Sequence, residues 1–114
     1  MNNRELLEMA AKAAGYKVVF VHCNLVPMRS DVKPNGQLSV WNPIDSDSDA
    51  FRLAVDLGFD VAVMDDKDLS HVYARKNGCP MHYATVYWYT TNNDKYAATR
   101  LAIVKCAAEV GRAM

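Results

Sequence analysis

The sequence predicts an α+β fold, a three-layer α-β-α sandwich in which helices flank a small mixed or antiparallel sheet. Three segments, at about residues 3–14, 47–57 and 95–112, have apolar residues at helical spacing. Short β-rich runs lie between them, which gives the order α-β-β-α-β-(β)-β-α. Because the strands are not each followed by a helix, a doubly wound parallel sheet is disfavoured.

The composition indicates a single globular domain that spans residues 1–114. Of the 114 residues, 51% are hydrophobic and 23% are charged, a mixture typical of folded domains. Lys plus Arg and Asp plus Glu both number 13, so the formal net charge is zero. This balance disfavours duplex nucleic acid as a partner, because no overall positive field attracts phosphates. We expect the domain to fold alone or as a small homo-oligomer.

The distribution of apolar and cysteine residues predicts a cytoplasmic protein. The apolar runs are too short for a membrane span, and the charged segment 1–5 does not resemble a signal peptide. The three cysteines, Cys23, Cys79 and Cys106, are far apart in sequence. In a cytosolic chain this pattern is typical of reduced thiols and not of disulfides.

Capping residues mark where the predicted helices begin. Asn2 with Glu5, and Ser46 with Asp49, have the form of N-terminal capping pairs, and residues 91–94 cap the last helix. The second helix is expected to be more than half buried. Its apolar residues are a stripe of Ala50, Leu53, Ala54 and Leu57 with Phe51 and Val55 beside it.

The β-rich runs differ in the burial that they predict. Residues 16–22 are apolar enough for a central strand covered on both faces, and 38–41 and 60–64 are further strands. Residues 69–74 have the pattern of a short strand, although the segments 24–37 and 65–82 are mostly without a clear pattern. Asn77-Gly78-Cys79-Pro80 is typical of a turn.

Residues 83–90 form the clearest strand, and its two faces differ. Ala84, Val86 and Trp88 lie on one face by alternation. The other face presents Tyr83, Thr85, Tyr87 and Tyr89. Tyrosine offers large contact area with a polar tip, so this face is a candidate partner surface. The alternative is that a second helix layer covers it.

The stretch from Trp41 to Asp49 is a second candidate surface, for a partner or a small ligand. Asp45, Asp47 and Asp49 alternate like the first ligands of a calcium-binding EF-hand, but Ala50 stands where that loop needs glycine. We favour helix capping for these carboxylates, a turn for Asn42, and a core position for Trp41. A nucleotide at this helix start is an alternative that the carboxylates oppose by repelling phosphate.

The cysteines and histidines suggest two further sites that the sequence does not favour. Cys79 and His82, together with His22 and Cys23, would supply four zinc ligands. His22 and Cys23 are adjacent, however, and adjacent residues on a strand point to opposite faces, so both cannot easily reach one ion. Cys79 with His82 or His71 would make a nucleophile pair, which nothing local marks. Cys106 lies on the apolar stripe of the last helix, as a small core residue. The five glycines are scattered at helix ends and turns, so we predict no phosphate-binding loop. Since none of the Cys, His and Asp groups is favoured as a site, we also predict no catalytic residue, metal or cofactor.

Two sequence blocks carry a family resemblance. The first block is the Trp-Asn-Pro stretch at 41–43, followed by an acidic cluster and by the run 50–55. The second block consists of residues 97–104 and 107–111 in the last helix. With the opening helix, they resemble the phage ABA-sandwich domain proteins, small proteins of tailed phages and prophages. A weaker similarity runs to the lambdoid NinX-like proteins. The resemblance implies an α-β-α sandwich and a phage origin, and it carries no catalytic residues with it.

These observations favour a phage or prophage accessory protein in the bacterial cytoplasm. We expect it to act without catalysis by binding a host or phage protein. One alternative is a small-ligand protein that binds a nucleotide at residues 42–49. A further alternative is a small hydrolase that uses a Cys-His pair or a metal ion.

Overall fold

The computed structural model describes residues 2–22, 26–76 and 79–114, with the backbone alone for 75–76 and 79–81. This part of the chain forms three α-helices and two three-stranded antiparallel sheets, which confirms the α+β class. The elements follow in the order α1 (Asn3–Ala14), β1 (Val18–Val21), β2 (Val26–Arg29), a 3₁₀ turn η1 (Pro34–Gly36), β3 (Ser39–Val40), α2 (Asp47–Leu57), β4 (Asp60–Met64), β5 (Leu69–Lys76), β6 (Cys79–Tyr87), a 3₁₀ turn η2 (Trp88–Thr91) and α3 (Lys95–Arg112).

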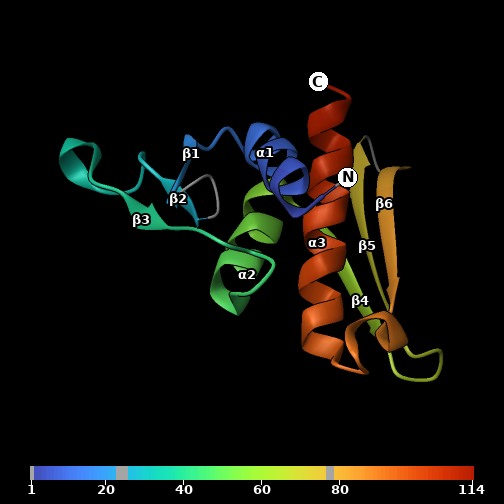
Figure 1. The fold of residues 1–114 in the computed structure, drawn as a ribbon. Coiled ribbons are helices and arrows are strands. Elements are labelled where there is room, and N and C mark those ends of the chain that lie inside the picture. Colours follow the sequence, from blue (N-terminus) through green and yellow to red (C-terminus); the bar gives the residue numbers. More distant parts are fainter. Residues whose placement is uncertain (1, 23–25, 77–78) are drawn as a thin grey trace.

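The long helix α3 lies at the centre of the molecule. One face of the β4-β5-β6 sheet packs on α3, and α1 and α2 pack on the side of α3 that faces away from this sheet (Figure 1). The layer order is therefore sheet, α3, then α1 with α2, where the sequence predicted the sheet in the middle. The composition of α3 explains this, because alanines around the helix let neighbours approach from several sides. Its buried residues are Ala98, Ala102, Ile103, Val104, Cys106, Ala107, Ala108 and Gly111.

The second sheet, β1-β2-β3, forms an arm that projects from the α1 and α2 side of the molecule (Figure 1). In the arm, β1 is an edge strand and β2 is central, so the predicted central strand at 16–22 is corrected. The sequence missed β2, whose Pro27 is unusual in the middle of a sheet. Pro27 is buried against the body, whereas the opposite face of the arm presents apolar side chains to solvent, including Val19 and Val40.

The second half of the chain forms a long hairpin before α3. β5 extends two residues beyond the predicted 69–74, and β6 begins four residues before Tyr83. The final strand ends at Tyr87, because the chain turns into η2 at Trp88. The predicted turn at 77–80 lies partly outside the described residues. On the α3 side of this hairpin the side chains of Ser70, Val72 and Val86 are buried.

The predicted helix boundaries are confirmed, and capping accounts for them. Asn2 accepts a hydrogen bond from the Glu5 N–H, and Asp94 accepts two at the start of α3. Gly15 ends α1 with φ +74°, a left-handed conformation that glycine adopts without strain. Gly111 lies inside the last turn of α3, one residue before the helix ends at Arg112.

Candidate functional site

Trp41 is part of the hydrophobic core, as its position after a strand predicted. Only 3% of its surface is exposed, and its ring meets Tyr16 edge to face at 5.7 Å between centroids. This is a favourable aromatic geometry that anchors the end of β3 against the segment after α1. A partner could not reach Trp41 without opening the core.

The Asn42 side chain organises the turn that leads into α2. Its Oδ1 accepts a hydrogen bond from the Ile44 N–H at 3.1 Å, and its Nδ2 donates to Asp45 at 3.1 Å. Ser46 caps α2 by accepting from the Asp49 N–H at 3.3 Å. The Ser46–Asp49 pair is capped in one direction only, because the Asp49 carboxylate accepts from the Asn42 N–H at 2.9 Å and the Ser46 N–H donates to the Asn42 carbonyl.

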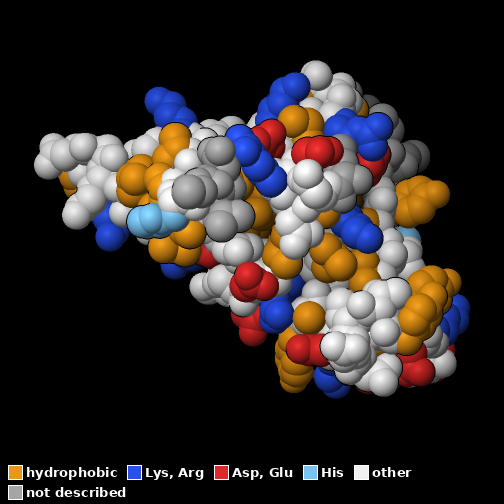
Figure 2. All heavy atoms as spheres, in the orientation of Figure 1, with side chains coloured by type: hydrophobic (Ala, Val, Ile, Leu, Met, Phe, Trp, Pro, Cys, Tyr) orange, Lys and Arg blue, Asp and Glu red, His pale blue; other side chains and the backbone are white. Residues whose placement is uncertain are grey.

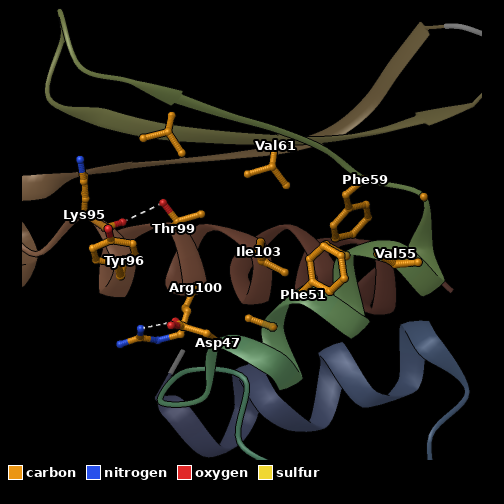
Figure 3. Close-up of a pocket in the computed structure, with 14 residues that line it drawn as sticks. Asp47, Phe51, Val55, Phe59, Val61, Lys95, Tyr96, Thr99, Arg100 and Ile103 are labelled. Carbon is orange, nitrogen blue, oxygen red and sulfur yellow. Dashed lines mark hydrogen bonds and ion pairs between the residues drawn. The ribbon is translucent and has the colours of Figure 1, made fainter.

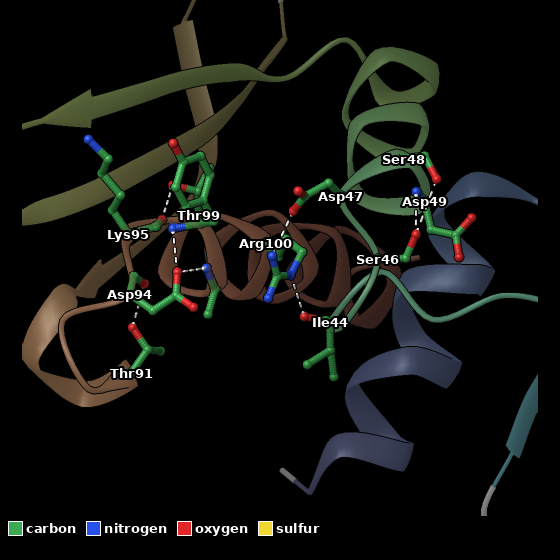
Figure 4. A network of polar contacts seen from close by, with 12 residues as sticks. Ile44, Ser46, Asp47, Ser48, Asp49, Thr91, Asp94, Lys95, Thr99 and Arg100 are labelled. Carbon is green, nitrogen blue, oxygen red and sulfur yellow. Dashed lines mark hydrogen bonds and ion pairs between the residues drawn. The ribbon is translucent and has the colours of Figure 1, made fainter.

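Asp47 belongs to a contact between α2 and α3. The Arg100 Nη1 lies 2.6 Å from the Asp47 carboxylate, and Arg100 Nε donates to the Ile44 carbonyl at 2.8 Å (Figure 4). Asp45 and Asp49 accept from the side chain and the N–H of Asn42, whereas Asp47 pairs with Arg100, so the three carboxylates do not converge on one point. Within the described chain, no group of three His, Cys, Asp or Glu side chains could hold a metal ion.

The tyrosine face is the outer surface of the β4-β5-β6 sheet and its continuation into η2. Tyr83, Tyr87 and Tyr89 are between 47% and 73% exposed, and the α3 layer lies on the opposite face. Figure 2 shows hydrophobic side chains standing on the surface over β6 and η2. The alternation predicted which residues share this face, and the structure leaves the face uncovered.

Aromatic contacts link the tyrosine face across strands. The His71 ring on β5 contacts the rings of Tyr73 and Tyr83, at 5.0 and 5.8 Å between centroids. Tyr87 and Tyr89 stack at 5.8 Å. Such pairs favour particular positions of the rings on this surface.

An acidic turn lies at one end of the tyrosine face. Asp65, Asp66 and Asp68 are exposed in the β4–β5 turn, and the Trp88 N–H donates to the Asp68 carbonyl at 2.9 Å. Leu69 at the start of β5 pairs with Tyr87. The carboxylates therefore lie beside the Tyr87 end of the tyrosine face.

An apolar groove of about 440 Å³ lies between α2, β4 and α3 (Figure 3). Phe51 and Val55 on α2, and Val61 and Val63 on β4, form its walls and are between 42% and 67% exposed. The sequence missed this groove, because it predicted that Phe51 and Val55 are buried beside the core stripe. Their i, i+4 spacing on a second stripe was the available signal.

One end of the apolar groove is polar. Asp47 and Arg100 form their ion pair there, next to Lys95, Tyr96 and Thr99 at the start of α3 (Figure 3). The Lys95 ammonium lies 6.0 Å from the Tyr96 ring. The middle of the groove, by contrast, has hydrophobic side chains only.

The cysteine and histidine sites are resolved only in part. Cys106 is buried, and its thiol donates to the His82 carbonyl at 3.7 Å. Burial raises the pKa of Cys106 to about 11, which leaves it a poor nucleophile. His22 follows β1 of the arm and His82 lies in β6 of the other sheet. Cys23 and the side chain of Cys79 lie outside the described residues, so the structure does not test the zinc and Cys-His sites that the sequence disfavoured.

Comparison with models of protein families, with curated proteins and with solved structures finds no match. The phage ABA-sandwich resemblance therefore stays a prediction from the sequence. Among the described residues, no helix combines the length and the apolar character that crossing a membrane requires.

Proposed function

We propose that this protein is a phage or prophage accessory protein that binds a host or phage protein through the tyrosine face, in the bacterial cytoplasm and without catalysis. The observation that carries the proposal is the exposure of Tyr83, Tyr87 and Tyr89 on a sheet face that α3 leaves free. The phage origin rests on the sequence resemblance alone.

Tyrosines suit a surface that is exposed before binding and covered after it. Their hydroxyls stay hydrated in the free protein, and their rings bury large areas at a low entropy cost. Tyrosine is also among the residues that contribute most to protein interfaces. The apolar groove is less suited to a partner that comes and goes, because its valines and Phe51 have no polar atoms to hydrate.

The three carboxylates of the acidic turn outnumber its one cation, the exposed Lys67, and so favour a protein partner that presents arginine. An arginine can stack on Tyr87 or Tyr89 and pair with the carboxylates of Asp65, Asp66 or Asp68. The same carboxylates repel phosphates, whereas surfaces that stack single-stranded nucleic acid combine aromatic rings with positive charge. The proposal is therefore a protein partner with a basic binding segment.

A capture experiment tests this function. The tagged chain is incubated in bacterial lysates prepared with and without phage infection, and retained proteins are quantified by mass spectrometry. We expect one partner to be retained, and the double variant Tyr87→Ala with Tyr89→Ala to lose it. The variant Asp65→Asn with Asp66→Asn should retain less of it in low salt.

The matched control changes two exposed side chains of the arm, Val19→Ala with Val40→Ala, and should retain the partner as the wild type does. Retention that survives the tyrosine substitutions would contradict the assignment to this face. Retention of nothing from either lysate would count against the binding function as a whole.

A further inference from the structure

The face of the β4-β5-β6 sheet that packs on α3 is wider than the helix that covers it. Neighbouring strands lie about 4.8 Å apart and a helix is about 10 Å across, so one helix covers about two strands. The helix α3 packs on β5 and β6, where Val72 and Val86 are buried. On β4, Val61 pairs with Val72 and Val63 pairs with Ser70, and both valines remain exposed on this same face. The sheet has room for a second helix beside α3.

The chain itself presents a helix of the required kind. Phe51 and Val55 stand one turn apart on α2 as an apolar ridge that faces across the groove toward Val61 (Figure 3). The ridge of one copy can therefore fit into the unfilled groove of a second copy. A two-fold axis satisfies both at once, since each copy then fills the groove of the other.

We propose that the apolar groove is a homodimer interface, in which α2 of each copy lies antiparallel to α2 of the other and covers its β4. Phe51 and Val55 of one copy then contact Val61 and Val63 of the partner copy. The exposed parts of these four side chains and of Tyr96 amount to on the order of 500 Å² per copy. Doubled and with the surrounding rim included, this area reaches the range of specific interfaces, about 1,200–2,000 Å² in total.

The charges around the apolar groove are compatible with its own two-fold image. The middle of the groove has no charged side chain, so no like charges meet at the axis. Lys95 and the ion pair of Asp47 with Arg100 lie together at one end (Figure 3). An antiparallel arrangement places these two ends far apart. A purely apolar centre is typical of permanent homodimers and not of transient partners.

Two other roles for exposed apolar surface fit less well. The apolar face of the arm has fewer strongly exposed side chains than the groove, namely Val19 and Val40 on its strands. A small ligand in the groove would leave Phe51 partly in water, whereas ligand sites bury most of their ligand and lining. The dimer also leaves the tyrosine faces free, because they lie on the other side of the sheet. It therefore presents two copies of that surface and does not depend on the proposed function.

Sedimentation equilibrium of the full chain tests the dimer. We expect a mass twice the chain mass of 12.7 kDa at micromolar concentration. Phe51→Asp and Val63→Asp should each raise the dimer Kd at least ~30-fold. The controls Tyr89→Asp and Tyr87→Asp match these positions in exposure, 73% and 47% against 67% and 49%, and should leave the Kd unchanged.

A second measurement locates the contact and does not depend on the stability of a variant. A photo-crosslinking amino acid replaces Phe51, and chains of two isotopic compositions are mixed. We expect mixed-isotope crosslinks from position 51 to the peptide that contains residues 60–64. A monomeric wild type would overturn the proposal, as would a dimer that persists in Phe51→Asp or crosslinks that stay within one chain. A monomer that retains an apolar small molecule in native mass spectrometry would assign the groove to a ligand instead.

Discussion

The Tyr16 hydroxyl donates a hydrogen bond to the Asp56 carboxylate and so connects the segment before β1 to the last turn of α2. The Arg29 guanidinium of the arm lies over the same ring at 3.5 Å from its centroid. Trp41 meets the ring at its edge. Tyr16 is therefore the residue at which the arm, α2 and the core come together.

Tyr16 gives the stability of the protein a dependence on alkaline pH. Burial, and then the hydrogen bond to Asp56, raise the pKa of Tyr16 from its usual 10 to about 12. The unfolded chain loses this proton near its ordinary pKa while the folded chain keeps it. The contribution of Tyr16 to the free energy of unfolding is thus complete below that pKa and falls as the pH rises toward the folded value. Urea titrations at a series of alkaline pH values should show a steeper loss for the wild type than for Tyr16→Phe.

The control for this prediction is Tyr89→Phe, which removes an exposed phenol and should leave the pH slope of the wild type intact. At neutral pH, Tyr16→Phe should cost about 0.5–1.5 kcal/mol for the lost hydrogen bond. Equal slopes for wild type and Tyr16→Phe would show that the phenol ionises alike in both states.

Ser70 is the one fully buried polar side chain in the described core, and it links Trp88 to Thr99 in a chain of hydrogen bonds. Trp88 Nε1 donates to Ser70 Oγ at 3.1 Å, and Ser70 Oγ lies 2.7 Å from Thr99 Oγ1. Thr99 Oγ1 in turn donates to the Lys95 carbonyl at 2.7 Å. Ser70→Ala leaves the Trp88 N–H without an acceptor, and we expect it to lower the free energy of unfolding by about 1–3 kcal/mol.

Thr99→Val is the matched control for Ser70, because it removes a hydroxyl from the same network but leaves the bond from Trp88 to Ser70. Its cost in urea unfolding should be smaller than that of Ser70→Ala. A reversed order would place the main contribution of the network between Ser70 and α3.

The sequence predicted local structure where a single residue determines it. The helix boundaries follow from Asn2, Ser46 and Asp94, whose side chains cap the first N–H groups and need no tertiary contact to be recognised. β2 was missed because Pro27 masks a strand signal that depends on pairing with β1 and β3.

Exposure was harder to predict than element type. Alternation assigned Tyr83 and Tyr87 to one face, but phenols tolerate water and core alike, so the sequence left open whether a helix covers them. Phe51 and Val55 were predicted as buried because an apolar stripe normally meets the core. Their exposure follows from how far β4 extends past α3, a tertiary relationship that periodicity does not contain.

Cys106 should be chemically inert in the folded protein. Its pKa of about 11 leaves little thiolate near neutral pH, and its side chain is buried. In a chain with Cys23→Ser and Cys79→Ser, we expect alkylation by iodoacetamide at about pH 8 to be at least ~100-fold slower than in urea. Mass spectrometry of the labelled chain measures both rates. Similar rates would mean that the site opens readily or that the thiol is not buried.

Position 111 of α3 is occupied by glycine because of a tertiary contact and not because of helix propensity. In an isolated helix, Gly111→Ala should stabilise by about 1 kcal/mol, since alanine is the better helix former. In this fold a Cβ at position 111 would lie 2.0 Å from the Met9 carbonyl oxygen of α1. Because that oxygen belongs to the backbone, the two helices must move apart. We expect a loss of about 3 kcal/mol or more in urea unfolding.

Gly58→Ala is the control for Gly111, because a Cβ there meets no atom within 4 Å although φ is +67°. Strain in the left-handed conformation alone should cost about 1–2 kcal/mol, which is less than the cost at Gly111. The sign of the Gly111→Ala effect on the free energy of unfolding therefore tests how closely α1 and α3 pack. Stabilisation would mean that α1 and α3 are farther apart than the structure has them, and destabilisation beyond that of Gly58→Ala would mean that their close contact requires glycine.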